Sequence, residues 1–211
     1  MELCHPARME SWVHADEIYQ VNSMYLLPDD AWAYELTPAS RDRGRMSLIV
    51  LIPDATPDNG PFTPKGSTHA RVVLEDGDLP WPVLSRFLQS VGSSDDIVDD
   101  EQGVVAGDLS LSCNTWRFAD RSFEVNSYHH SENDCWCYEL YETTCANPNN
   151  DYLEVRIPGL QPAAGSFAPV SADRATIRAH GSWPVPWPVF RHFVNAITSS
   201  GDIIKDLPAR G

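Results

Sequence analysis

The chain has 211 residues, of which 42 % are apolar and seven are tryptophan, so it holds enough apolar material for packed cores and is not a disordered protein. Thirty acidic against 15 basic residues give a formal net charge of −15, which argues against nucleic acid and anionic lipid as partners, because both recruit cationic side chains. The absence of a signal-peptide pattern or a long apolar run, together with five unevenly spaced cysteines, predicts a cytoplasmic protein with reduced thiols and no membrane span.

The first half of the chain predicts several strands followed by one helix. Residues 19–26 and 31–37 alternate in polarity and are joined by a turn that contains Pro28, Asp29 and Asp30. Residues 46–52 form an apolar run that ends at Pro53, and residues 71–74 predict a further strand. The helix begins at Pro82, where a missing N–H costs nothing, and its apolar residues recur at helical spacing up to Val91.

The second half repeats these features in the same order. Tyr19-Gln-Val-Asn-Ser23 returns as Phe123-Glu-Val-Asn-Ser127, and Trp32-Ala-Tyr-Glu-Leu36 returns as Trp136-Cys-Tyr-Glu-Leu140, both 104 positions later. Pro80-Trp-Pro-Val83 returns as Pro186-Trp-Pro-Val189, 106 positions later. An unchanged order with so small a drift in spacing indicates an internal repeat.

We therefore expect an α+β protein formed by tandem duplication of a small module. Each module is predicted to be a mostly antiparallel sheet of four to five strands with one C-terminal helix packed on it, and a pseudo-two-fold axis is predicted to relate the two modules. Residues 1–100 form the first copy, 101–108 the linker and 109–211 the second copy. The recurring bulky residues are assigned to the two cores: Trp12/Trp116, Trp32/Trp136, Tyr34/Tyr138, Trp81/Trp187 and Phe87/Phe193.

A cluster of cysteine and histidine residues suggests a metal site at first sight. With one nearby aspartate, it comprises His129, His130, Asp134, Cys135, Cys137 and Cys145. However, Cys135 and Cys137 align with Ala31 and Ala33 of the first half, which predicts small buried positions, where a free cysteine behaves as a small apolar residue. We therefore predict no metal and no cofactor, and expect Cys135→Ala and Cys137→Ala to leave folding and metal content unchanged.

Glu35 and Glu139 recur at matching positions on predicted strands. If the pseudo-two-fold axis brings them together, they form a polar site between the copies, suited to acid–base chemistry or to a cation. The alternative is a structural role, in which each glutamate accepts hydrogen bonds from its neighbours.

Acidic residues gather on either side of the first predicted helix. Glu75, Asp76 and Asp78 precede it, and Asp95, Asp96, Asp99, Asp100 and Glu101 follow it. These eight residues predict a docking surface for a basic protein. The alternative is a set of solvated loops without a specific role.

The sequence contains no glycine-rich phosphate loop, no His-Glu-x-x-His and no Gly-x-Ser-x-Gly, and no catalytic residue is predicted. The pattern therefore favours a binding protein over an enzyme. The most concrete hypothesis is a cytoplasmic immunity-type inhibitor that binds and neutralises a basic bacterial toxin domain, as a monomer or homodimer. One alternative is an enzyme or small-ligand-binding protein with its site between the two copies. The other is a structural or assembly component.

Overall fold

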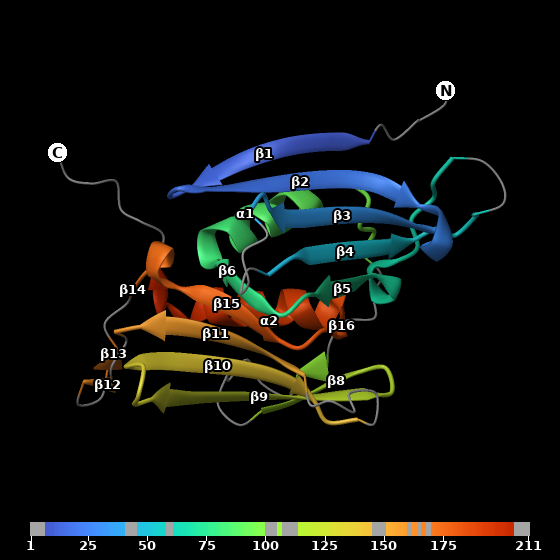
Figure 1. Ribbon diagram of the computed structural model, residues 1–211. Helices are drawn as coiled ribbons and strands as arrows, with labels where there is room; N and C mark the ends of the chain where they lie inside the picture. Colours follow the sequence, from blue (N-terminus) through green and yellow to red (C-terminus); the bar gives the residue numbers. More distant parts are fainter. Residues whose placement is uncertain are drawn as a thin grey trace.

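The computed structural model describes residues 7–40, 46–57, 61–99, 105–106, 114–144, 151–159, 162–163, 166–167 and 170–204. Over these residues the protein is α+β, with two large antiparallel sheets and two α-helices (Figure 1). The α+β class and the antiparallel sheets agree with the sequence-based expectation.

The first sheet has six strands in the order β1-β2-β3-β4-β5-β16. Their bounds are β1 Arg8–His14, β2 Glu17–Leu26, β3 Ala31–Pro38, β4 Leu48–Pro53, β5 Arg71–Leu74 and β16 Pro184–Pro186. The predicted turn after β2 contains a short 3-10 helix, η1 (Leu27–Asp29), and ends at Asp30 in the left-handed conformation. The strand β1 was not predicted, because only Trp12 along it is fully buried and its apolar pattern is therefore weak.

The second sheet has seven strands in the order β6-β15-β11-β10-β9-β8-β7. Their bounds are β6 Gly77–Pro80, β15 Thr176–His180, β11 Tyr152–Pro158, β10 Cys135–Glu142, β9 Arg121–His130, β8 Asn114–Phe118 and β7 Val105–Ala106. Two small ladders complete the strands, one of β12 (Pro162–Ala163) with β13 (Ser166–Phe167) and one of β14 (Val170–Ser171) with β17 (Ile203–Ile204). The strand β7 lies within the predicted linker.

Each sheet receives one strand from the other half of the chain. The strand β6 pairs with β15 in the second sheet, and β16 pairs with β5 in the first. Two matching backbone hydrogen bonds of 2.9 Å follow the exchanged strands. Trp81 N–H donates to the Ala175 carbonyl, and Trp187 N–H donates to the Ala70 carbonyl. This exchange brings the first sheet to six strands, and together with β7 it brings the second to seven, where the sequence predicts four to five in each.

Both helices follow the exchanged strands directly. The helix α1 spans Trp81–Gly92 and α2 spans Trp187–Ser200, each with a proline in its first turn. In Figure 1 both lie behind the strands, and two 3-10 helices, η2 (Ser67–His69) and η3 (Ala172–Arg174), contact α2 and α1 respectively. No helix in the described part of the chain is long and apolar enough to cross a membrane.

Most of the buried apolar residues that the structure describes, from both halves of the chain, form one continuous core. Trp12, Trp116, Phe87 and Phe193 lie within it, as predicted, and so do Trp81 and Trp187. Tyr34 and Trp136 are partly buried and pack against the same core. A single core forms where two were expected, because the exchanged strands carry each half into the other's sheet.

Candidate functional site: a polar face on the second sheet

The two sheets turn similar residues toward the helices but different residues toward the outside. Successive side chains of a strand point to opposite faces, so the pairing register defines each face. Ile49 pairs with Glu35 and Val73 in the first sheet, and Glu154 pairs with Glu139 and Arg178 in the second. Ile49 and Glu154 therefore occupy matching outer positions, one apolar and one charged.

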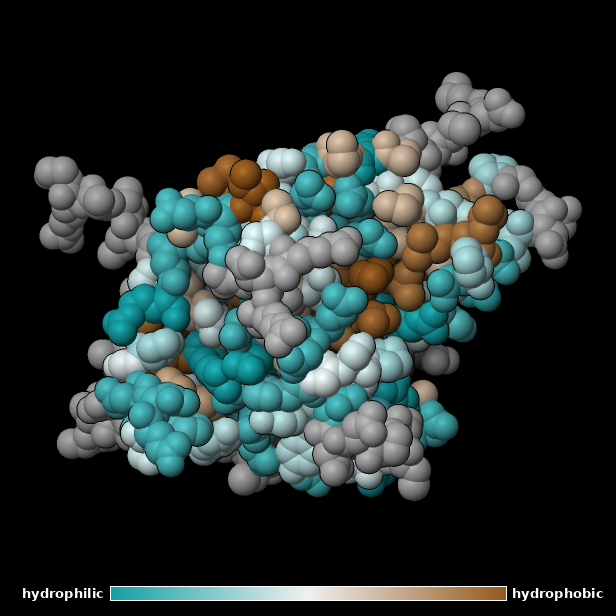
Figure 2. Space-filling model, in the orientation of Figure 1, coloured by the Kyte–Doolittle hydropathy of each residue, from teal (hydrophilic) through white to brown (hydrophobic). Residues whose placement is uncertain are grey.

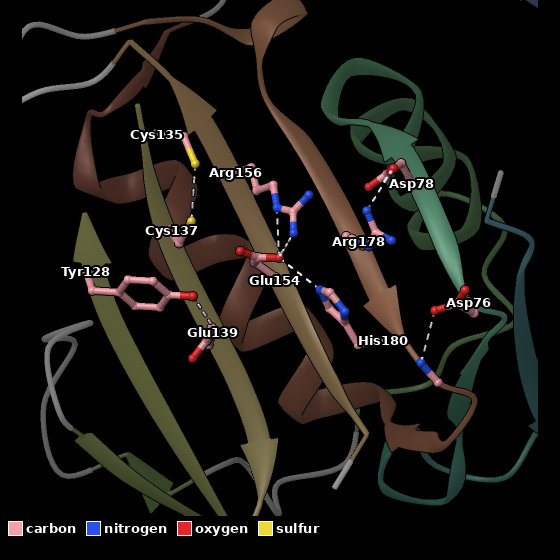
Figure 3. Close-up of polar contacts among 11 residues, drawn as sticks. Asp76, Asp78, Tyr128, Cys135, Cys137, Glu139, Glu154, Arg156, Arg178 and His180 are labelled. Carbon is pink, nitrogen blue, oxygen red and sulfur yellow. Dashed lines mark hydrogen bonds and ion pairs between the residues drawn. The ribbon is translucent and has the colours of Figure 1, made fainter. Parts of the chain in front are cut away.

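The outer face of the second sheet carries a group of neighbouring polar side chains, which we call the polar face, and Figure 3 shows most of them. It comprises Asp78, Tyr128, Cys135, Cys137, Glu139, Tyr141, Glu154, Arg156, Arg178 and His180. These residues come from five adjacent strands, β9, β10, β11, β15 and β6. The sheet thus assembles groups that lie far apart in the sequence.

Glu154 lies at the centre of the polar face and is only 2 % exposed. Its carboxylate accepts a hydrogen bond of 2.8 Å from Arg156 Nε, and His180 Nε2 lies 2.9 Å from the same oxygen. Burial alone would raise the pKa of Glu154, but the hydrogen bonds from Arg156, His180 and Cys137 outweigh burial and lower it. The carboxylate is therefore ionised and holds its neighbours in fixed positions.

Two tyrosines form separate hydrogen bonds between β9 and β10 on the same face. Tyr128 donates to Glu139 over 2.7 Å, and Tyr141 donates to Glu124. Burial raises the pKa of Tyr128, and the Glu139 carboxylate raises it further. The ring of Tyr152 stacks on His180 with 4.1 Å between centroids. The face therefore presents aromatic rings whose polar ends are already oriented.

The first half of the chain completes the edge of the polar face. Asp78 on β6 forms an ion pair of 3.5 Å with Arg178, and Asp76 accepts a hydrogen bond from the Gly181 N–H over 3.3 Å. Glu75 is exposed next to them. Three of the acidic residues predicted for partner binding therefore border this face, because β6 is inserted into the second sheet.

The other predicted acidic residues lie at the opposite end of α1. Asp95 and Asp99 are exposed, whereas Asp96 is 3 % exposed and accepts a hydrogen bond from Tyr34. Asp100 and Glu101 fall outside the described residues. Since α1 has 12 residues and a helix rises about 1.5 Å per residue, about 18 Å separates the two acidic groups. The structure thus divides the predicted surface and buries Asp96.

The structure does not bring Glu35 and Glu139 together. Glu35 lies on β3 and Glu139 on β10, each three strands from the exchanged edge strand of its own sheet. At a strand spacing of about 4.8 Å, about 14 Å of sheet lies between each glutamate and that edge. Glu139 instead belongs to the polar face of its own sheet.

Cys135 and Cys137 are buried, at 2 % and 0 % exposure, with their Sγ atoms 3.5 Å apart. Burial raises the pKa of the Cys137 thiol, and the nearby Glu154 carboxylate raises it further, so the thiol is a poor nucleophile. His129 points to the other side of the sheet, with Nε2 3.3 Å from Asp134. No group of three or more potential ligands could hold a metal ion among the described residues, and Cys145 lies outside them.

A second feature is a cleft of about 660 Å³ between the two helices. Its walls include Trp81 and Leu88 from α1 and Trp187 and Val194 from α2. Asp99, one of the residues predicted for partner binding, also lines it. The volume lies within the range of small-molecule sites.

Sequence reasoning missed Glu154, Arg156, Arg178 and His180. The internal repeat contained a signal for the first three, because it aligns Glu154 with Ile49, Arg156 with Leu51 and Arg178 with Val73. Charged residues at positions that are apolar in the matching register of the first sheet are not required for a sheet of this kind to form.

No protein-family model, curated protein or solved structure matches this chain. The internal comparison between the two sheets therefore serves as the reference for separating residues that the fold needs from residues that serve another purpose.

Proposed function

We propose that this protein is an acidic protein-binding module that captures a basic partner on its polar face. The observation that carries the proposal is the difference between two matching surfaces. Where the second sheet has Glu154, Arg156 and Arg178, the first has Ile49, Leu51 and Val73 in the same pairing register. Because the first sheet forms without these charges, their presence in the second supports a role in recognition.

The composition of the polar face also suits a protein partner. Tyrosine and arginine dominate the energetics of protein interfaces, and both are held here by hydrogen bonds before any partner arrives. Figure 2 shows mainly hydrophilic colours over the second sheet, the lower one in this view, whereas hydrophobic residues gather over the first. A preorganised polar surface loses little side-chain freedom when it binds.

The charge of the molecule supports a basic partner. The net charge is −15, and Glu75 and Asp76 are exposed beside the polar face. Long-range attraction of opposite charges speeds encounter, which matters for an inhibitor of a harmful target. Most concretely, we propose an immunity-type inhibitor that neutralises a basic bacterial toxin domain in the cytoplasm, as a monomer or homodimer.

We also propose that the chain is a tandem duplication with a pseudo-two-fold axis, consisting of residues 1–100, a linker at 101–108 and residues 109–211. The strand orders β1-β2-β3-β4-β5-β16 and β8-β9-β10-β11-β15-β6 match, with one strand exchanged in each direction. Left-handed residues recur in matching hairpins: Ala15 and Ala119 have φ of 51° and 52°, and Asp30 and Asp134 have φ of 44° and 47°. Such recurrence at non-glycine residues supports a shared origin.

The test needs a basic toxin domain as the probe, to be sought among secreted proteins encoded by neighbouring genes, with growth rescue and stopped-flow association as readouts. Glu75→Gln, Asp76→Asn and Asp95→Asn together should slow association about tenfold at low salt, because steering charges act on encounter. Asp16→Asn, Asp120→Asn and Glu132→Gln, also exposed, form the control with the same charge change. An association rate that changes neither with added salt nor in either triple variant contradicts electrostatic steering. If the probe neither binds nor is neutralised in the growth assay, the proposed inhibitor function is wrong.

A second candidate function is binding of a small ligand in the cleft between α1 and α2. It is favoured by the cleft's volume of about 660 Å³ and by walls drawn from both halves of the chain.

A further inference from the structure

The cleft lies between α1 and α2, and each helix also packs on strands and on a 3-10 helix. The helix α1 contacts β6, β15 and η3, and α2 contacts β16, β5, β17 and η2. Small residues line part of the gap, including Ser85, Gly92 and Ala172. Trp81, Leu88, Trp187 and Val194 supply apolar walls, so the cleft is suited to a largely apolar molecule.

The charge carried by the two helices is opposite to that of the molecule. Neither α1 nor α2 contains an aspartate or glutamate, although the chain has 30 acidic residues against 15 basic ones. Each helix contains one arginine and no lysine. These arginines, Arg86 on α1 and Arg191 on α2, both line the cleft. The helical walls therefore present positive charge in an acidic protein.

Both arginines can accept an anion at low cost. Arg191 pairs with Asp99 over 3.2 Å, but the two side chains are 51 % and 75 % exposed, and such exposed pairs contribute little. Arg86 lies over the ring of Trp12, with 4.3 Å from its Cζ atom to the ring centroid. Stacking uses the flat face of a guanidinium and leaves its in-plane N–H groups for an oxyanion.

The acidic residues of the cleft belong to segments outside the two helices. Asp99 follows α1 and Asp173 lies on η3, and both are exposed. Asp99 already neutralises Arg191, so an incoming anion would replace one carboxylate by another at that guanidinium. The apolar walls of the cleft then contact the body of the incoming anion, and Asp99 has no such apolar contacts to lose.

We propose that this cleft binds a free amphipathic anion, with an aromatic or aliphatic body between the tryptophans and a carboxylate or sulfonate at Arg86 and Arg191. The ligand would displace Asp99 from Arg191. The proposal rests on the second candidate function and is independent of capture of a basic protein.

Two dyes of the same ring system test the proposal. The first is 8-anilinonaphthalene-1-sulfonate, and the second is N-phenyl-1-naphthylamine, which lacks the sulfonate. Fluorescence titration, with energy transfer from tryptophan, should show one saturable site that prefers the sulfonate about tenfold, as charge-assisted hydrogen bonds predict. Arg86→Gln with Arg191→Gln should remove that preference without weakening the neutral dye. Asp99→Asn should instead tighten binding of the sulfonate.

Filling the cleft locates the site. A Cβ at Gly92 meets no atom within 4 Å, so Gly92→Leu is tolerated by the fold and should weaken both dyes at least tenfold. Ser90→Leu places the same side chain on α1 outside the cleft lining and should leave both affinities unchanged. Urea denaturation confirms that each variant remains folded.

The outcomes separate the two ideas. Equal affinity for both dyes overturns the anion preference and leaves small-ligand binding standing. Failure of both dyes to bind overturns small-ligand binding in this cleft as well. Binding that Gly92→Leu does not change places the dye elsewhere, such as the exposed apolar residues Met9, Val13 and Ile18, and also overturns the proposal.

Discussion

The first and second sheets of this protein share a pattern of buried residues but differ on their outer faces. Toward the helices, Leu48, Val50 and Ile52 of β4 correspond to Leu153, Val155 and Ile157 of β11, and all six are fully buried. On the outside, Ile49 and Leu51 correspond to Glu154 and Arg156. The core tolerates few changes because it is close-packed, whereas the outer face is free to diverge.

This difference makes one half a control for the other. Burying a charged network is weak evidence for stability, because desolvation of the charges offsets much of their attraction. The first sheet has Leu51 and Val73 at the positions of Arg156 and Arg178, and it still completes its hydrogen-bonded ladder. The first sheet therefore forms without these charges, and the proposed binding role gives one reason for their presence in the second.

The largest effect is expected from separating the halves. Fragment 1–104 lacks β16 of its own sheet and fragment 105–211 lacks β6 of its own sheet, and each lacks part of the single core. Neither fragment alone should show a cooperative urea transition by circular dichroism, and mixing them should restore one. A fragment with its own sigmoidal transition would break the comparison, because the halves would then be independent modules. A protease site inserted at 101–104 is the matched control, and the cut chain should stay folded.

The second effect concerns the centre of the polar face. Glu154→Ile installs the first sheet's residue but leaves Arg156 and His180 without their carboxylate. Loss of one partner from a buried ion pair costs about 3 kcal/mol of unfolding free energy. Adding Arg156→Leu and Cys137→Ala, which also copies the first sheet, should recover most of that loss in urea denaturation. If the triple variant is as unstable as the single one, the two outer faces are not interchangeable.

The acid dependence of stability sharpens the same point. The folded pKa of Glu154 is lowered, so its contribution is full above the ordinary glutamate pKa of about 4 and is lost as the pH falls through the lower folded value. The difference in unfolding free energy between the parent protein and Glu154→Gln should therefore shrink below pH 4. A difference that stays constant down to pH 2 would contradict the ionised carboxylate.

The smallest effect concerns a pair of contacts that the halves share. Tyr34 donates to Asp96, and Tyr138 donates to Asp202. Asp96 is 3 % exposed, whereas Asp202 is only partly buried and also accepts from Ser200. Tyr34→Phe should therefore cost about 1.5 kcal/mol and Tyr138→Phe about half of that, measured by urea denaturation.

An ultraviolet titration checks the first of these pairs. Burial, followed by the hydrogen bond to Asp96, raises the pKa of Tyr34 to about 12. A titration step near pH 12 that disappears in Tyr34→Phe would assign that step to Tyr34. In the urea measurements, equal stabilities of Tyr34→Phe and Tyr138→Phe would show that burial of the accepting carboxylate does not matter.

The sequence alone determined most elements and their burial. Alternation in residues 19–26 and 31–37 predicted β2 and β3, and helical spacing after Pro82 predicted α1, because these patterns reflect which side of an element meets the core. The repeat also identified Cys135 and Cys137 as small buried positions, which their exposures of 2 % and 0 % match. Periodicity is a local property, and local order was sufficient for these predictions.

Only the tertiary structure decided which strands share a sheet. The segment Gly77–Pro80 is too short and too poor in apolar residues for its sequence to predict a strand. Its partner strand β15 lies about 100 residues later in the sequence. That pairing placed Asp76 and Asp78 beside Arg178, separated them from Asp95 and Asp99, and kept Glu35 and Glu139 apart. Such contacts depend on long-range pairing and packing free energy, which residue spacing within one segment does not encode.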